Sequence, residues 1–158
     1  SGIISDNVSR SSGLVKSAGG GKVLQVVTSG AIDQVYSSNA TTYTLVTSHA
    51  LAITPSATTS KVFIIMSFCA RGSGTAVTYN TIYGAGSNLG PADGFATYHD
   101  DNATADNEQH TTLTFLDSPN TTSEVTYELY AKSAGAGDSA RVNAKGSDSV
   151  ITLMEIGA

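Results

Sequence analysis

The run at 61–71, with the sequence KVFIIMSFCAR, is the most apolar stretch of the chain and lies between segments rich in Gly, Ser and Thr. Its β-branched and aromatic residues and its short length favour a strand over a helix. Alternate residues of a strand point to opposite faces. One face would carry Val62, Ile64, Met66, Phe68 and Ala70, and the other Phe63, Ile65, Ser67 and Cys69. Both faces are largely apolar, so both have to be covered. The core of the domain can cover one of them, and a neighbouring subunit is a candidate for the other.

The rest of the sequence fits a small all-β domain. Hydrophobic residues make up 40% of the chain and charged residues only 13%, which supports a packed core. Short apolar runs separated by Gly, Ser, Asn and Pro predict roughly ten strands. We expect them near 22–28, 31–36, 42–46, 49–54, 61–70, 75–83, 95–99, 111–116, 123–132, 140–143 and 149–156. This pattern predicts an antiparallel β-sandwich of jelly-roll type.

The expected organisation is one head domain preceded by an arm. Residues 1–21 are polar and end in Gly19–Gly21, so we interpret them as an N-terminal arm or the end of a stalk. Residues 22–158 form the globular domain. The turn at Asn120 could join the neighbouring strands as a hairpin.

Three of the expected strands, at 22–28, 61–70 and 149–156, are apolar on both faces. If they lie side by side, their sheet has an apolar outer face, which a soluble monomer rarely tolerates. We therefore predict an oligomer.

Several classes of partner are disfavoured. The net charge is −5 and no Lys/Arg cluster occurs, so nucleic acid is an unfavourable partner. No apolar run approaches the ~18 residues of a membrane span, and the first residues do not form a signal peptide. The single cysteine, Cys69, excludes an intrachain disulfide and is expected to be a small buried residue, which suits assembly in a reducing cytoplasm.

The segment 84–110 is the longest with weak strand signals, and such loops are usually functional or mobile. Asp100, Asp101, Asp106 and Glu108 could supply oxygen ligands to a cation such as calcium. Their spacing does not match an EF-hand, so a solvated acidic loop is the preferred interpretation. The sequence predicts no bound metal or cofactor.

The same segment holds histidines and tyrosines with two interpretations each. His99 and His110 could bind zinc or nickel near an oligomer axis, although a single His is more often a surface or hydrogen-bonded residue. Tyr79, Tyr83 and Tyr98 could stack on sugars or could simply cover the ends of the sandwich.

Enzymatic chemistry is poorly supported. The nucleophile motif G-x-S-x-G is absent, and the acidic residues fall mostly in turns rather than as a carboxylate pair on a rigid scaffold. We expect a protein that is not an enzyme.

Three segments carry a resemblance to a known family: GGGKVLQVV at 19–27, ITPSATTSKVFIIM at 53–66 and VITLMEIGA at 150–158. They resemble tail-fibre and other virion proteins of aquatic bacteriophages, and the similarity extends over roughly residues 13–158. The resemblance implies the C-terminal tip of a homotrimeric fibre, assembled in the cytoplasm of the bacterial host. It also implies recognition of a bacterial surface glycan or protein, and contact with other virion proteins through the N-terminal arm.

The receptor contacts are predicted to lie in the long loop, because loops can vary while scaffold strands must keep their pattern. The predicted receptor-binding residues are Tyr83, Tyr98, His99, Asp100, Asp101, Asp106 and Glu108. The alternative is a purely structural domain for trimerisation or capsid decoration, whose loops contact only other virion proteins.

Overall fold

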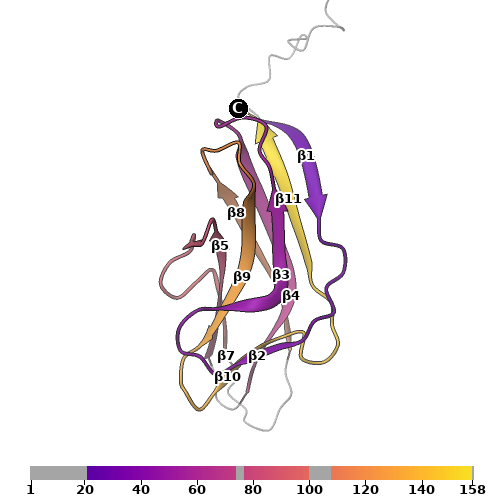
Figure 1. Cartoon of the computed structure of the whole chain (residues 1–158). Helices are drawn as coiled ribbons and strands as arrows, with labels where there is room; N and C mark the ends of the chain where they lie inside the picture. Colours follow the sequence, from indigo (N-terminus) through magenta and orange to yellow (C-terminus); the bar gives the residue numbers. More distant parts are fainter. Residues whose placement is uncertain (1–20, 74–76, 100–107, 158) are drawn as a thin grey trace, which may run out of the picture.

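The computed structural model describes residues 21–73, 77–99 and 108–157, with the backbone alone for Ser73 and His99. In these ranges the regular structure is β-strand only. The strands are β1 (Lys22–Thr28), β2 (Tyr36–Ser38), β3 (Thr44–Ile53), β4 (Lys61–Ser73), β5 (Val77–Gly84), β6 (Ser87–Asn88), β7 (Ala96–His99), β8 (Gln109–Asp117), β9 (Val125–Ser133), β10 (Ser139–Val142) and β11 (Val150–Gly157). They form two antiparallel sheets packed face to face (Figure 1). The predicted fold class, an antiparallel β-sandwich of jelly-roll type, is confirmed.

The first sheet, called sheet 1, is built around β4. The whole of strand β8 pairs with 62–70 on one side of β4. On the other side, β11 pairs with 61–67 and β10 pairs with 70–73, so two strands share one flank of β4. Strand β1 lies beyond β11, and β2 lies beyond β10. The two-sided apolar strands β1, β11 and β4 are therefore neighbours, which meets the condition for an apolar outer face.

The second sheet, called sheet 2, has the order β3-β9-β5, with β6 and β7 both paired to the outer side of β5. Residues 46–49 of β3 are inserted as a bulge opposite Leu129, because Leu45 pairs with Tyr130 and Ala50 with Glu128. Two separate strands were predicted at 42–46 and 49–54, and the structure joins them into one bulged strand. A bulge breaks the alternation of faces, which explains why the pattern looked like two elements.

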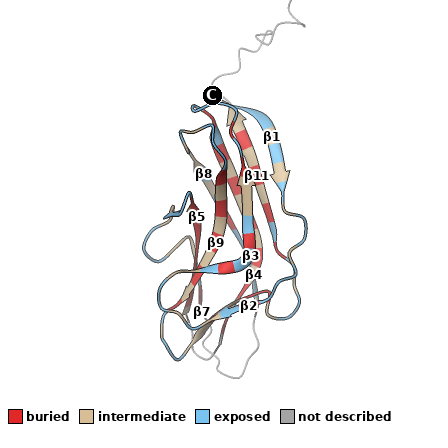
Figure 2. Cartoon of the chain, viewed as in Figure 1, coloured by how far each residue is buried: buried red, intermediate tan, exposed pale blue. Residues whose placement is uncertain are grey.

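The core lies between the sheets and follows the alternation of the strands. In β9 every second residue from Val125 to Ser133 is buried, and in β4 every second residue from Val62 to Ala70 is buried. Figure 2 shows the buried positions as bands across β4, β9 and β11, whereas β1 is exposed for most of its length. The sequence separates the two faces of β4 without saying which is internal, and the structure places Val62, Ile64, Met66, Phe68 and Ala70 on the internal face.

Other details of the sequence prediction are wrong. Strands β8 and β9 do not form a hairpin, because β8 pairs with β4 in sheet 1 and β9 pairs with β3 and β5 in sheet 2. The expected strand at 31–36 is reduced to a single bridge between Ile32 and Ser149, followed by β2. A hydrophobic pattern does not say in which sheet a strand finds its partner.

Two further predictions concern the arm and the cysteine. The predicted N-terminal arm, 1–21, lies outside the described residues except for Gly21, and β1 begins at Lys22. Cys69 was expected to be buried. It falls on the outer face of sheet 1, opposite His110 of β8, and is half-buried.

Candidate functional site

The outer face of sheet 1 carries a row of apolar side chains that crosses four strands. The strand register places Val26 of β1 beside Met154 of β11, Met154 beside Phe63 of β4, and Phe63 beside Leu116 of β8. We call these four residues the apolar row. Directly opposed residues on one face are near enough to pack together. The row therefore makes one continuous apolar strip on the outside of the molecule.

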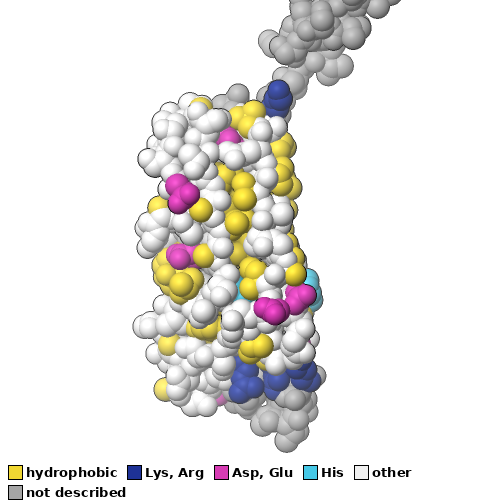
Figure 3. Space-filling model, turned by 45° about the vertical axis from the view of Figure 1, so that its right-hand side comes forward, with side chains coloured by type: hydrophobic (Ala, Val, Ile, Leu, Met, Phe, Trp, Pro, Cys, Tyr) yellow, Lys and Arg dark blue, Asp and Glu magenta, His cyan; other side chains and the backbone are white. Residues whose placement is uncertain are grey.

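This strip is open to solvent in the single chain. Val26 is 57% exposed and Leu116 is 47% exposed, both unusual for large aliphatic residues. Of the seven exposed large hydrophobic residues in the described part of the chain, five belong to β1, β8 and β11 of sheet 1: Val23, Leu24, Val26, Leu116 and Val150. Figure 3 shows hydrophobic side chains running down the side of the molecule that includes β1. Contiguous patches of this kind mark interaction sites.

The outer face of sheet 2 has a different character, because four tyrosines gather on it. Tyr83 of β5 and Tyr130 of β9 stack with ring centroids 3.8 Å apart and an interplanar angle of 17°. Tyr43, just before β3, meets Tyr83 edge to face at 6.3 Å. Tyr79 lies beside Lys132 in the strand register. We call Tyr43, Tyr79, Tyr83 and Tyr130 the tyrosine cluster.

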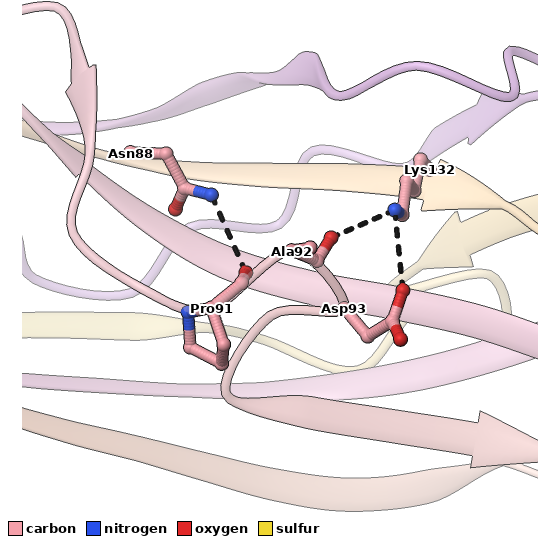
Figure 4. Close-up of polar contacts among 5 residues, drawn as sticks. All are labelled: Asn88, Pro91, Ala92, Asp93 and Lys132. Carbon is pink, nitrogen blue, oxygen red and sulfur yellow. Dashed lines mark hydrogen bonds and ion pairs between the residues drawn. The ribbon is translucent and has the colours of Figure 1, made fainter.

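Lys132 fixes this cluster to the loop between β6 and β7 (Figure 4). Its ammonium lies over the rings of Tyr43 and Tyr79, at 4.7 and 4.9 Å from their centroids. The Nζ atom donates to the carbonyl of Ala92 at 2.8 Å and lies 3.6 Å from the carboxylate of Asp93. A cation held by two rings, a carbonyl and a carboxylate has its positive charge largely satisfied. The loop is thereby fastened against sheet 2.

Two hydroxyls of the cluster, those of Tyr43 and Tyr130, have a raised pKa and stay protonated. Burial raises the pKa of Tyr43 to about 12, and the nearby Asp93 carboxylate adds to the effect. Burial also raises the pKa of Tyr130, with a further contribution from Glu128. A neutral hydroxyl can both donate and accept a hydrogen bond. The Tyr43 hydroxyl itself is buried. The surface therefore offers tyrosine rings beside a carboxylate, a combination suited to binding hydroxyl-rich ligands rather than to acid–base chemistry.

The predicted receptor-binding residues lie in different parts of the structure. Tyr83 belongs to the tyrosine cluster. Tyr98 is only 7% exposed and packs in the core, so the prediction that it faces a ligand is wrong. Glu108 is half-buried, and no described residue donates a hydrogen bond to its Oε1 atom. His99 pairs with Val77 through its backbone, while its side chain and all of Asp100, Asp101 and Asp106 lie outside the described residues.

The sequence prediction missed Tyr43, Tyr130 and Lys132. A signal for Tyr130 was present, because the alternation in 123–132 already placed it on the wet face of its strand. Nothing in the sequence brings Tyr43 to the same place. It reaches the cluster only because β3 and β5 flank β9 in sheet 2.

In the described ranges no three His, Cys, Asp or Glu residues come close enough to hold a metal ion. Of Asp100, Asp101, Asp106 and Glu108, considered above as calcium ligands, only Glu108 is described, and the preferred interpretation of this segment as a solvated acidic loop stays a prediction. The described part of the chain contains no helix able to cross a membrane.

Comparison with known proteins gives a result in structure only. No protein-family model matches the chain, and no curated protein matches its sequence. Among solved structures, that of infectious bursal disease virus Gt strain matches with a TM-score of 0.45 and 14% identity, over 85% of this chain and 38% of the viral one. The infectious bursal disease virus VP2 subviral particle matches with a TM-score of 0.42 and 16% identity, over 85% and 37%. The chain thus spans less than two fifths of these proteins, and the similarity is too low to transfer a function.

Proposed function

We propose that this chain is a non-enzymatic structural domain of a virus particle that associates with copies of itself through the outer face of sheet 1. The apolar row is the observation that carries the proposal. It joins the two-sided strands β1, β11 and β4 to β8 and leaves Val26 and Leu116 about half exposed in the single chain.

The physical argument is the cost of leaving this face in water. Complete burial of a Val or Leu side chain contributes about 1.5–3 kcal/mol, so burying the exposed half of one contributes roughly 1 kcal/mol. Val23, Val26, Leu116 and Val150 share this face by their register and together supply several kcal/mol per subunit. A second copy of the same chain offers the same apolar face, and homo-oligomers are built on such repeated surfaces.

The sequence resemblance to virion proteins of aquatic bacteriophages supports placing the domain in a virion, and it favours a homotrimer. The one close Ser–His contact found among the described residues, between His49 and Ser149, is buried and offers no nucleophile to a substrate. Partners other than the chain itself would be other virion proteins.

Light scattering during size-exclusion chromatography tests the proposal. At micromolar concentration a homotrimer has three times the 16.1 kDa of the chain, about 48 kDa. Val26→Asp should shift the protein to a monomer that stays folded, because that position is solvated in the single chain, and its melting temperature should fall by what the lost interface contributes.

Val35→Asp is the matched control, since Val35 is another exposed valine, 47% exposed, that precedes β2 and lies outside the apolar row. It should leave the oligomer intact. A wild-type protein of 16.1 kDa at this concentration would contradict the proposal.

Adhesion to a host receptor is the second candidate function, and the tyrosine cluster is the observation that favours it. Tyr130 lies opposite Leu45, which is 40% exposed, and near Glu128 of the same strand. An amphipathic surface of this kind, on the sheet that faces away from the proposed interface, suits a saccharide on a bacterial surface. This would make the domain the tip of a tail fibre, as the resemblance implies.

Adsorption of the isolated domain to an array of bacterial polysaccharides tests adhesion. Tyr130→Ala should abolish binding and leave the oligomer unchanged, whereas Val35→Ala should affect neither. Binding that survives Tyr130→Ala would place the receptor contacts elsewhere. Several weak sites on one oligomer would reinforce each other, so a low single-site affinity is compatible with adhesion.

A further inference from the structure

A buried chain of polar contacts joins the two sheets. His49, in the β3 bulge of sheet 2, places its Nδ1 atom 2.8 Å from the carbonyl of Thr47 and its Nε2 atom 2.9 Å from the Oγ of Ser149. Ser149 directly precedes β11 of sheet 1, and its Oγ lies 2.9 Å from the Oδ1 of Asn143, which directly follows β10. His49, Ser149 and Asn143 are each at most 1% exposed.

The orientation of the Asn143 amide is fixed by its other contacts. Its Nδ2 donates to the carbonyl of Ile32 at 3.1 Å, and its Oδ1 faces the backbone N–H of Cys69 at 3.5 Å. Exchanging the two amide atoms would set two carbonyl oxygens against each other and two N–H groups against each other. Oδ1 therefore points to Ser149 as an acceptor.

A neutral His49 cannot satisfy this chain. If the ring proton is on Nδ1, it donates to Thr47, and Nε2 then needs the single hydroxyl proton of Ser149, which leaves Oδ1 of Asn143 facing an oxygen without a proton. If the ring proton is on Nε2, Ser149 can donate to Asn143, but Nδ1 then faces the Thr47 carbonyl as acceptor against acceptor. Either neutral tautomer leaves one contact without a proton.

A protonated His49 would complete the chain, with Nδ1 donating to Thr47, Nε2 to Ser149, and Ser149 to Asn143. That state puts a positive charge in a buried site. Burial is the largest effect on the pKa of His49 and lowers it, while the Thr47 carbonyl raises it to a smaller extent. No charged side chain of the described residues contributes to this shift. Charged residues do lie close in sequence to Ile32, Asn143 and Ser149, namely Asp33, Lys145 and Asp148.

Each protonation state has a cost in the closed site, since the neutral ring leaves one contact without a proton and the protonated ring buries a charge. The ring belongs to residues 46–49, which are extra to the ladder with β9, and Ser48 has a left-handed φ of 66°. Residues inserted in a bulge are not held by the ladder hydrogen bonds of their strand. We propose that His49 is an acid-sensitive latch between the two sheets: on protonation the ring leaves its site, and the contact of the β3 bulge with residues 143–149 opens.

The direction of the pH dependence follows from linkage. The pKa of His49 is lower in the folded protein than the ~6.5 of a solvated imidazole, so the open state binds the proton more tightly. The latch is closed above about pH 6.5 and weakens as the pH falls below that value. At about pH 5 the protonated form of a solvated imidazole outnumbers the neutral form by about 30 to 1. This ratio sets the largest increase in the population of the open state that His49 alone can cause.

Hydrogen exchange measured by NMR on the whole chain tests the latch. Ile32 and Ser149 donate their amide protons to each other's carbonyls, at 2.8 and 2.9 Å, and Ser149 also carries the hydroxyl that His49 contacts, so these two amides are the reporters next to the latch. After correction for intrinsic exchange, their opening should increase several-fold, up to about 30-fold, between about pH 7.5 and about pH 5. His49→Gln should remove this increase, and His110→Gln, which changes an exposed histidine of β8, should keep it.

Titration of the His49 ring signals in the same protein supplies the second measurement. The proposal expects a midpoint below ~6.5 together with the increased opening. A midpoint at or above that value, or opening that is unchanged or reduced at low pH, would mean that the protonated ring stays and locks the chain, and would overturn the proposal. If His49→Gln does not fold, the wild-type titration and His110→Gln decide between these outcomes.

Discussion

Glu155 of β11 is a buried carboxylate without a cation beside it in the described structure, and replacing it tests how the sandwich tolerates such a charge. The side chain is 1% exposed. Its Oε1 accepts from the backbone N–H of Ser56 at 2.7 Å and from the Ser56 hydroxyl at 2.6 Å, and its Oε2 accepts from Nε2 of Gln25 at 2.7 Å. Glu155 therefore ties β1 and the turn between β3 and β4 to the last strand.

Glu155→Gln keeps the shape and changes the donors. The new amide oxygen can keep both bonds to Ser56, but its NH2 group then faces the NH2 group of Gln25. If Gln25 rotates its amide, the carbonyl of Thr54 loses the hydrogen bond that it now accepts from Gln25 at 2.7 Å. The loss of one hydrogen bond lowers the unfolding free energy by about 1 kcal/mol. The conversion of two charge-assisted hydrogen bonds into neutral ones lowers it by about 1 kcal/mol each. The expected loss of unfolding free energy is about 3 kcal/mol.

The pH dependence gives an independent signature. The hydroxyl of Ser56, followed by Ser60, Gln25 and the Ser56 amide, outweighs burial and holds the pKa of Glu155 near 2, down from 4.5. Because the folded pKa is lower than the unfolded one, the stabilisation is present above about pH 4.5 and is lost as the pH falls toward 2. Glu155→Gln cannot titrate and should lose less stability over this range.

Urea unfolding followed by circular dichroism, at about pH 7 and about pH 3.5, measures both effects. Glu128→Gln, which changes a half-buried carboxylate on the outer face of β9, is the control and should cost less than about 0.5 kcal/mol. A loss below 0.5 kcal/mol for Glu155→Gln, or an acid-induced loss equal to that of the wild type, would refute the reasoning.

Two further predictions concern the loop that covers sheet 2. Gly94→Ala should destabilise the protein by roughly 2–4 kcal/mol in thermal or urea unfolding, because Gly94 has a φ of +73° and a Cβ there would lie 2.3 Å from the carbonyl oxygen of Asn80. Gly86→Ala, at a φ of +77° with open space around it, should cost only about 1 kcal/mol, and equal losses for the two would exclude the clash. Lys132→Met should increase hydrogen exchange at the Gly94 amide, which donates to Pro91, and unchanged exchange there would show that Lys132 does not hold the loop.

The sequence predicted the strands well where alternation or continuous apolarity was uninterrupted. The pattern does not say which face of β4 is internal, and it offers the adjacency of β1, β4 and β11 only as a condition for an apolar outer face. The alternation of β4 and β9 could be derived, as could the need to cover both faces of the three apolar strands, because each depends on local pattern. The pairing of β8 could not. The alternation of polar and apolar residues in β8 is equally compatible with pairing to β9 and with pairing to β4. Packing of the whole sandwich selects β4 as the partner.

The candidate sites were harder to predict for the same reason. Tyr43 and Lys132 are far apart in sequence and meet only through the order of the strands in sheet 2. Tyr98 was assigned to a ligand because it lies in a long loop region, yet its strand β7 turns the ring into the core. The contact of His49 with Ser149 spans 100 residues and depends on a bulge that no periodicity reveals.

The pairing of β1 with β11 also has a consequence for the order of folding. Every backbone partner of β1 in the sheet comes from 152–157, so the strand with three exposed apolar side chains, Val23, Leu24 and Val26, has no ladder until the last strand has been made. Pairings between such distant segments form slowly, and unpaired apolar edges are prone to aggregate in the meantime. During synthesis, β1 would therefore wait longest for its partner. Its protection by chaperones or by neighbouring nascent chains would decide the yield of folded protein more than its final stability does.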